Sequence, residues 1–294
     1  MTGASLTGPA PAGALADAER DAVHWMLADL RTADAVADVL DASAPDAVFH
    51  LAGLSFVPTS RDEPVNVCMA NVVAGVVLLA DIRRRRAAGA LDPVVVMIGS
   101  AEQYGAHDPA EGPLAEHAEC RPLTLYAASK GAQEVFALEA ARSDGLRVVC
   151  TRSFNHSGPG QAAHFLIPSL VRRVLAARGA AAPRPVTIGN GHTIRDFLHA
   201  EDVARAYLAL ALHGVPGEVY NVCSGDGVSV EALARDVCAR AGIAAEFASD
   251  PALRRAVDVP WLVGDHTKLR STTGWTPRRS RFDIIDDLLN AASH

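Results

Sequence analysis

The sequence predicts an α/β fold with a parallel sheet, because short apolar runs alternate with longer helical stretches in its first half. Strands are expected at 47–51, 93–98 and 146–151, and helices at 66–89 and 124–143. The strand runs are continuously apolar, which is typical of strands covered by helices on both faces. Ligands of such sheets bind at the carboxyl ends of the strands. Ser100 and the loop that follows Thr151 are therefore expected at a functional site.

The second half of the chain is expected to form a smaller lobe. From about residue 155 the predicted strands become shorter, and no Gly/Ser linker or internal repeat interrupts the chain. Strands are expected near 186–188 and 218–222, and helices near 165–179, 200–213, 229–241 and 282–292. We predict a first domain over 1–154, a second lobe over most of 155–294, and a cleft between them.

Composition argues against several classes of protein. A formal net charge of −7 disfavours a nucleic-acid-binding surface. No apolar run reaches the roughly 20 residues that span a bilayer, and no secretory signal opens the chain, so we expect a cytoplasmic protein without a membrane partner. The five cysteines lack metal-ligand spacing, so we expect reduced, buried thiols and no metal site. The basic run 83–86 is expected to be a solvated helix end, with anion binding as the alternative.

The strongest chemical signal is the stretch 126–130 (YAASK). Residues four apart lie on one face of a helix, so the Lys130 ammonium can lie near the Tyr126 phenol and favour its phenolate. An ordinary tyrosine has a pKa of about 10 and needs such help to exchange protons at neutral pH. Ser100, at the end of a strand of the same sheet, can hold a substrate oxygen. The spacing alone occurs by chance in many helices, and its place after a strand that ends in Ser100 makes it informative.

Several stretches, taken in order, resemble an extended short-chain dehydrogenase/reductase, the family of nucleotide-sugar epimerases, dehydratases and reductases. They are Asp29-Leu30, 45–53 (PDAVFHLAG), Asn71, 100–105 (SAEQYG) and 126–130. Further on, four stretches resemble the GDP-mannose branch of the family: 152–161 (RSFNHSGPGQ), 195–197 (RDF), 220–225 (YNVCSG) and 274–277 (GWTP). The resemblance covers about residue 23 to the end. It implies a Rossmann-like doubly wound parallel sheet with a smaller C-terminal substrate lobe.

The resemblance implies NADP or NAD as the cofactor and a GDP-linked 4-keto-6-deoxy sugar as the substrate. Hydride would pass to C4 of GDP-4-dehydro-6-deoxy-D-mannose and give GDP-D-rhamnose. Tyr126 would protonate the alkoxide, Lys130 would lower the Tyr126 pKa and hold the nicotinamide ribose, and Ser100 would bind the C4 oxygen. Proteins of this family often dimerise through helices near 66–89 and 124–143, so a homodimer is expected.

The resemblance also assigns binding residues. Cofactor contacts are expected at Asp29, Leu30, Leu51, Ala52, Gly53, Tyr126 and Lys130, and substrate contacts at Glu102, Asn155, Arg195 and Arg255. Guanidinium groups suit phosphate and ribose oxygens, but a salt bridge from Arg195 to Asp196 or Asp202 is the alternative. For Asn155 the alternative is a turn-forming role.

Ala101 favours a reductase over a dehydratase. The dehydratases of this branch carry Thr, then Asp or Ser, then Glu, where this chain has Ser100, Ala101 and Glu102. Expelling the C6 hydroxyl as water needs an acid and a base, and the Ala101 side chain cannot move a proton. Glu102 remains as a candidate base. A GDP-mannose 4,6-dehydratase and a non-catalytic nucleotide-sugar-binding protein of the same fold are the alternatives.

The opening stretch 1–8 (MTGASLTG) does not match the register of the family's TGxxGxxG cofactor loop. Counting from Thr2, Leu6 and Pro9 stand where the second and third glycines belong, and prolines disfavour the helix that should follow. We therefore expect that the first strand, the glycine loop and the first helix are missing. On this interpretation the opening residues form a loop, and at most one strand precedes Asp29.

Overall fold

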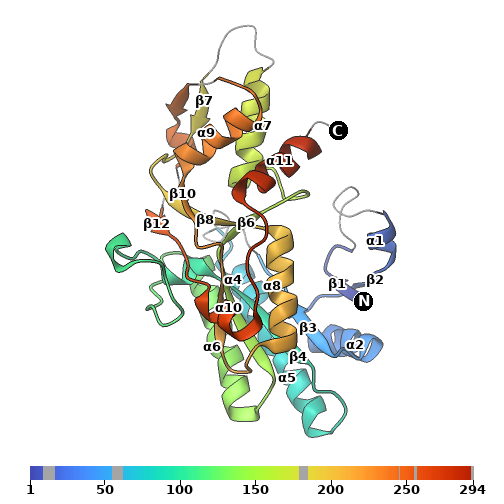
Figure 1. Cartoon of the computed structure of the whole chain (residues 1–294). Coiled ribbons are helices and arrows are strands. Elements are labelled where there is room, and N and C mark those ends of the chain that lie inside the picture. The colour runs from blue at the N-terminus through green and yellow to red at the C-terminus, as the bar shows by residue number, and fades with distance from the viewer. Residues whose placement is uncertain (9–16, 55–61, 179–184, 245, 255–256, 293–294) are drawn as a thin grey trace.

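The structure is a computed structural model that describes residues 1–294 except 9–16, 55–61, 179–184, 245, 255–256 and 293–294. Figure 1 shows a layered α/β body in the lower part of the view and a smaller lobe above it. The Rossmann-like parallel sheet predicted from the sequence is confirmed, and helices form layers on it.

The large sheet lies at the centre of the body. Its parallel strands, in spatial order, are β3 (Ala47–His50), β4 (Val94–Ser100), β5 (Val148–Ser153) and β9 (Val219–Val222). All of β5 is buried, which explains why its sequence shows no polar alternation. Because β9 lies beyond residue 155 and pairs with β5, the chain returns to this sheet after leaving it. The division at residue 154 stays a prediction.

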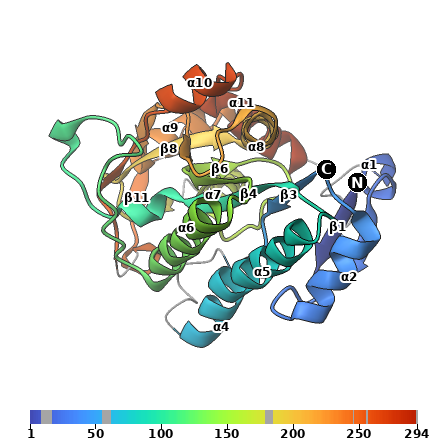
Figure 2. The ribbon, with the colours of Figure 1, turned by 90° about the horizontal axis from the view of Figure 1, so that it is seen from below.

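Helices cover both faces of the large sheet (Figure 2). One face carries α2 (Ala33–Ser43), α5 (Ala74–Ala87) and α6 (Leu125–Asp144), and the other carries α8 (Ala200–His213) and α10 (Thr267–Thr273). Alternate residues of β5 serve the two layers: Val148 and Cys150 pack with α5 and α6, whereas Val149 packs with α8. Burial of these apolar faces holds the layers together.

The helix predicted at 66–89 begins at Pro64 and contains a wider turn. It consists of α4 (Pro64–Cys68), a π-helical turn η1 (Met69–Val73) and α5. Within the described part of the chain, 64–87 is the helix with the length and apolar composition that could cross a membrane. Its residues Leu78, Leu79 and Ile82 pack into the core of the body, as expected of a core helix.

The arginines at the end of α5 are ion-paired. Arg85 binds Asp81 and Asp41, with N–O distances of 2.5 Å for both, and Arg83 binds Asp144 and Glu139. Because these carboxylates already bind the guanidinium groups, the run 83–86 fits the expected helix end better than a site that binds an anion.

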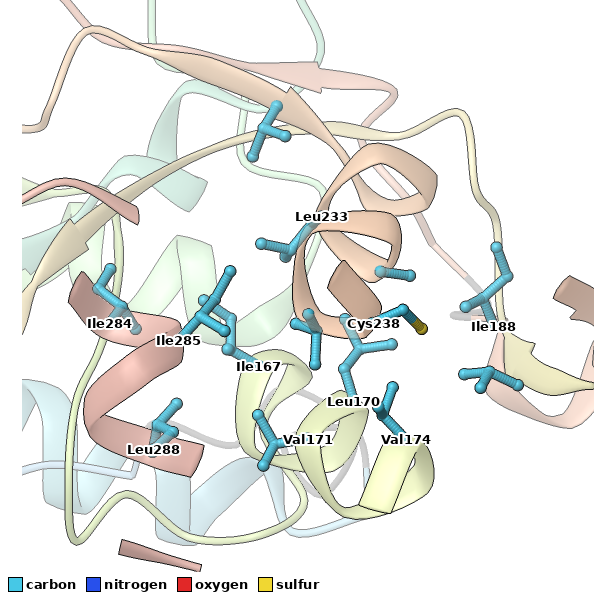
Figure 3. Packing of buried hydrophobic residues seen from close by; sticks show 14 of the residues in the cluster. Ile167, Leu170, Val171, Val174, Ile188, Leu233, Cys238, Ile284, Ile285 and Leu288 are labelled. Atoms are coloured by element: carbon cyan, nitrogen blue, oxygen red, sulfur yellow. The ribbon is translucent and has the colours of Figure 1, made fainter. Parts of the chain in front are cut away.

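The described residues of the smaller lobe form short strands and three α-helices. Strands β10 (Gly227–Ser229), β8 (Ile194–His199) and β12 (Trp261–Leu262) form one sheet, β6 (Asn155–Ser157) joins it at β8, and β7 (Val186–Ile188) pairs with β11 (Phe247–Ser249). Its core lies between α7 (Leu166–Arg178), α9 (Val230–Arg240) and α11 (Arg281–Ala291) (Figure 3). Leu170, Leu233 and Ile285 are completely buried there. Short 3-10 turns complete the chain at η2 (Ala101–Tyr104), η3 (Pro109–Glu111) and η4 (Pro251–Leu253).

The opening residues form a strand, so the loop expected there is wrong. Strand β1 (Thr2–Ser5) pairs in parallel with β2 (His24–Leu27), with α1 (Asp17–Asp21) between them in sequence. Among the described residues, two strands therefore precede Asp29 instead of one, because each needs only four residues. The absence of a first strand–loop–helix unit stays a prediction. The expectation of buried thiols holds at three of the five cysteines, because Cys120 is only half-buried and Cys68 is exposed.

Candidate active site

A cavity of about 700 Å³ opens at the carboxyl ends of β4 and β5. Its walls come from the ends of the large-sheet strands, from the start of α6 and from α8. The predicted site residues that line it are Leu51, Gly53, Ser100, Glu102, Tyr126, Lys130 and Asn155. The folded chain thus brings together residues as distant in sequence as Leu51 and Asn155. Their individual roles stay predictions.

Ser100 is held rigidly at the end of β4. Its Oγ accepts a hydrogen bond from the Glu102 N–H at 3.2 Å, and its own N–H donates to Gln103 Oε1 at 3.1 Å. These bonds make Ser100 the N-cap of the 3-10 turn η2, just before its first residue Ala101. The preceding residue, Gly99, must be glycine, because a Cβ there would collide with the carbonyl oxygen of Thr151 on β5.

Tyr126 lies in the first turn of α6, half-buried in the cavity wall. Thr124 caps this turn by accepting from the Ala127 N–H at 3.1 Å. Burial raises the Tyr126 pKa, a hydrogen bond with Ser100 lowers it, and the charge of Glu102 raises it. The net shift is upward, so the expected lowering of this pKa is wrong. The phenol is protonated at neutral pH.

The Lys130 ammonium, which was expected to lower the Tyr126 pKa, is hydrogen-bonded to other groups. Its Nζ donates to the carbonyl oxygen of Ile98 at 2.8 Å and to Gln133 Oε1 at 3.1 Å. Burial lowers its own pKa to about 8. The ammonium is therefore directed at the end of β4, although Lys130 shares a helix face with Tyr126 as the spacing predicts.

Asn71, in the π-helical turn η1, fixes the loop after β3. Its Oδ1 accepts from the Leu54 N–H at 2.7 Å, and its Nδ2 donates to the Leu54 carbonyl at 3.1 Å and to Ser129 Oγ at 2.9 Å. A Cβ at Gly53 would lie 2.7 Å from Asn71 Oδ1, so this position also requires glycine. The bare backbone of Gly53 then faces the cavity near Lys130.

The wall opposite α6 contains a hydroxyl pair that the sequence did not indicate. Ser153, at the end of β5, and Tyr207, on α8, lie 2.8 Å apart through their oxygens. Burial raises the Tyr207 pKa to about 12, so this phenol also stays protonated. A single tyrosine in a helix carries no sequence signal, and only the packing of α8 on the sheet brings it to the cavity.

Other predicted site residues lie away from this cavity. Asp29 binds Arg31 through Nη2 at 2.7 Å, and this partner lowers the Asp29 pKa to about 2. Leu30 packs against the core between α2 and α5, and Ala52 is not part of the cavity lining. Arg195 is buried on β8, with Nη2 2.9 Å from Asp258 Oδ1, rather than paired with the neighbours considered above. Arg255 lies outside the described residues.

The described residues fit the nicotinamide end of a dinucleotide. Gly53 offers open backbone beside Lys130, and Tyr126 and Ser100 lie at the same cavity. Gly3 does not form a phosphate loop, because it pairs with Trp25 inside β1–β2 and a Cβ there would lie 2.8 Å from the indole ring. Among the described residues no three His, Cys, Asp or Glu side chains gather in a way that could hold a metal ion.

Comparison with known proteins identifies the family of this chain. The family model described as GDP-mannose 4,6 dehydratase matches residues 12–288. The chain belongs to this family. The extended short-chain dehydrogenase/reductase group inferred from the motifs is thereby confirmed, and the chain is a nucleotide-sugar oxidoreductase of that type.

Two relatives show how close the match is. The chain is 35% identical over 249 residues to GDP-6-deoxy-D-mannose reductase of Pseudomonas aeruginosa, which covers 85% of this chain and 80% of the relative. It is 31% identical over 255 residues to a dTDP-glucose 4,6-dehydratase of Streptomyces niveus, with 87% and 71% covered.

Solved structures agree with these relatives. The structure of RMD from Pseudomonas aeruginosa complexed with NADPH superposes with a TM-score of 0.82 at 31% identity, over 92% of this chain and 89% of that one. A Thermus thermophilus UDP-glucose 4-epimerase complex with NAD gives a TM-score of 0.80 at 28% identity, over 92% and 85%. Members of the family therefore share the fold across reductases, dehydratases and epimerases.

Proposed function

We propose that this protein reduces the C4 ketone of GDP-4-dehydro-6-deoxy-D-mannose to GDP-D-rhamnose with NADPH or NADH. The observation that carries the proposal is the cavity that presents Ser100 and Tyr126 as hydroxyl donors beside Lys130. The reductase among the relatives, and the NADPH complex among the similar structures, support this reaction.

The residues suit proton delivery to a ketone oxygen. When bound, the reduced nicotinamide supplies the hydride. Ser100 and Tyr126 donate hydrogen bonds to the C4 oxygen, and Tyr126 passes its proton to the alkoxide that develops there. A raised Tyr126 pKa keeps the phenol protonated, which is the state that reduction requires. Asn155 and Glu102 line the cavity where the sugar would lie, and Lys130 would hold the nicotinamide ribose.

A dehydratase is the less supported alternative. Ala101 lies between Ser100 and Glu102 in the cavity lining and provides no proton donor for a departing C6 hydroxyl. A 6-deoxy substrate needs no such donor, which favours the reductase. A non-catalytic nucleotide-sugar-binding role would leave the Ser100, Tyr126 and Lys130 arrangement without a use.

Nucleotide binding followed by turnover tests the proposal. The purified chain is titrated with NADPH and then NADH by nucleotide fluorescence, and NADPH consumption is followed with GDP-4-dehydro-6-deoxy-D-mannose. Micromolar binding and formation of GDP-D-rhamnose are expected. Conversion of GDP-mannose without added reductant would instead identify a dehydratase, and failure of the folded chain to bind either nucleotide would favour the non-catalytic role.

We also infer a homodimer through the helix at 64–87, which begins with α4, and through α6. Val65 on α4 is 73% exposed, and on α6 Val135 and Phe136 are 66% and 48% exposed. Exposed apolar side chains on adjacent helices are typical of protein contacts. Sedimentation should give a dimer that Phe136→Asp weakens, and a monomer at all concentrations would contradict it.

A further inference from the structure

Glu134 continues the line of Tyr126 and Lys130 along α6. The three residues follow one another at four-residue intervals, so they share the face of the helix that meets the sheet. Lys130 and Glu134 are 5% and 8% exposed. A buried carboxylate needs partners, because an unpaired charge is strongly disfavoured in the interior.

The partners of Glu134 lead to Ser100. Glu134 forms a two-pronged pair with Arg152 on β5, at 3.0 Å through Nε and 2.6 Å through Nη2. Its Oε2 also accepts from Gln103 Nε2 at 2.9 Å. The other end of that amide, Gln103 Oε1, accepts from the Ser100 N–H. One amide therefore connects a carboxylate of α6 to the backbone of Ser100.

Arg152 supports η2 from a second side. Its guanidinium lies 4.8 Å from the ring centroid of Tyr104, and its Nη1 donates to the carbonyl of Glu116 at 3.0 Å. Tyr104 and Gln103 both belong to η2. An ion pair that only joined α6 to β5 would need neither contact, whereas the contact with Tyr104 supports the turn that follows Ser100.

We propose that Glu134 is a positioning residue that, through Gln103, fixes the Ser100 hydroxyl relative to the Tyr126 phenol. The inference rests on the proposed function, in which these two hydroxyls bind one ketone oxygen. Donors on two separate elements must be tied together to converge on one atom, and a misplacement of about 1 Å can cost roughly a hundredfold in rate. The link through Gln103 provides this tie.

Gln103→Met tests the link while leaving the Glu134–Arg152 pair in place. We expect kcat to fall roughly tenfold to a hundredfold while NADPH affinity is unchanged. Ser229→Ala, which removes the cap of α9 in the distant lobe, is the matched control for lost stability. Its melting temperature should fall without loss of kcat. Equal kcat values in Gln103→Met and wild type would overturn the proposal.

A second readout needs no turnover and so separates this inference from the proposed reaction. The chain contains four tyrosines, and in protein labelled with 3-fluorotyrosine the Tyr126→Phe variant assigns the Tyr126 fluorine resonance. Gln103→Met should move this resonance toward its position in Ser100→Ala, because the Ser100 hydroxyl, which influences the Tyr126 phenol, is then less firmly placed. An unmoved resonance contradicts the positioning role even if the enzyme proves to act on another sugar. If Gln103→Met does not fold, Gln103→Asn, whose amide is on a shorter side chain, should move the resonance in the same direction.

Discussion

Lys130 Nζ donates a hydrogen bond to the carbonyl oxygen of Ile98 at 2.8 Å, which joins the first half of α6 to β4 just before Ser100. The same Nζ contacts Gln133 Oε1 and has been removed from water, so the Lys130 pKa falls to about 8. The lysine in this chain thus links the helix of Tyr126 to the strand of Ser100.

Lys130→Met should change how stability depends on pH. Between pH 8 and the ordinary value of 10.5, the unfolded lysine binds a proton that the native lysine has lost, so wild-type stability rises with pH across this window. Below pH 8 both states are charged and the penalty is constant. We expect wild type to gain roughly 3 kcal/mol relative to the variant over the window. Urea unfolding at several pH values measures this, and a constant difference would contradict it.

Tyr126→Phe should abolish most turnover while keeping the fold. The phenol is the proton donor of the proposed reaction, and loss of such a group costs roughly a hundredfold to ten-thousandfold in rate. The ring is retained, so NADPH binding should remain within about twofold. The rate of NADPH consumption with the 4-keto sugar provides the test. Ser153→Ala, on the opposite wall, is a useful comparison, and near-normal turnover of Tyr126→Phe would exclude the proposed proton donor.

His50 should make the protein sensitive to acid. Burial, with a further contribution from the charge of Lys130, lowers its pKa to about 4 from the ordinary 6.5. Below pH 6.5 His50 binds a proton in the unfolded state but not in the native state, so stability falls as the pH falls toward 4. This group accounts for roughly 3 kcal/mol of that loss. His50→Asn should flatten the acid side of the stability profile relative to wild type, and parallel profiles would show that His50 does not titrate as stated.

Asp196→Ala should destabilise the smaller lobe strongly. The Asp196 carboxylate is fully buried and accepts from the N–H groups of Ser224, Gly225 and Gly264 and from the Ser224 hydroxyl. Removing it leaves buried donors unpaired, at a cost of roughly 2–4 kcal/mol in the free energy of unfolding. The melting temperature measures the effect. Asp286→Ala is the control, because its pair with Arg240 is exposed to solvent and should contribute little to stability. Equal effects of the two variants would contradict the prediction.

The elements of the large sheet were predictable because their signals are local. The helix expected at 124–143 is Leu125–Asp144, and the strand expected at 93–98 is Val94–Ser100. Continuous apolar runs and a terminating glycine such as Gly145, with φ of 65°, suffice to place such elements. Strand β8 was not predicted, because its sequence mixes apolar residues with Arg195 and Asp196. Those charges can be buried only because residues distant in sequence form ion pairs or hydrogen bonds with them.

The fold class and the residues at the centre of the cavity follow from local sequence patterns, since helical spacing relates Tyr126 to Lys130 and a strand end presents Ser100. Tertiary structure decided which groups these side chains contact. It directed Lys130 to Ile98, joined Gln103 to Glu134, and placed Tyr207 against Ser153, 54 residues away in the chain. Such contacts depend on how helices pack on the sheet, and no local pattern in the sequence encodes that packing.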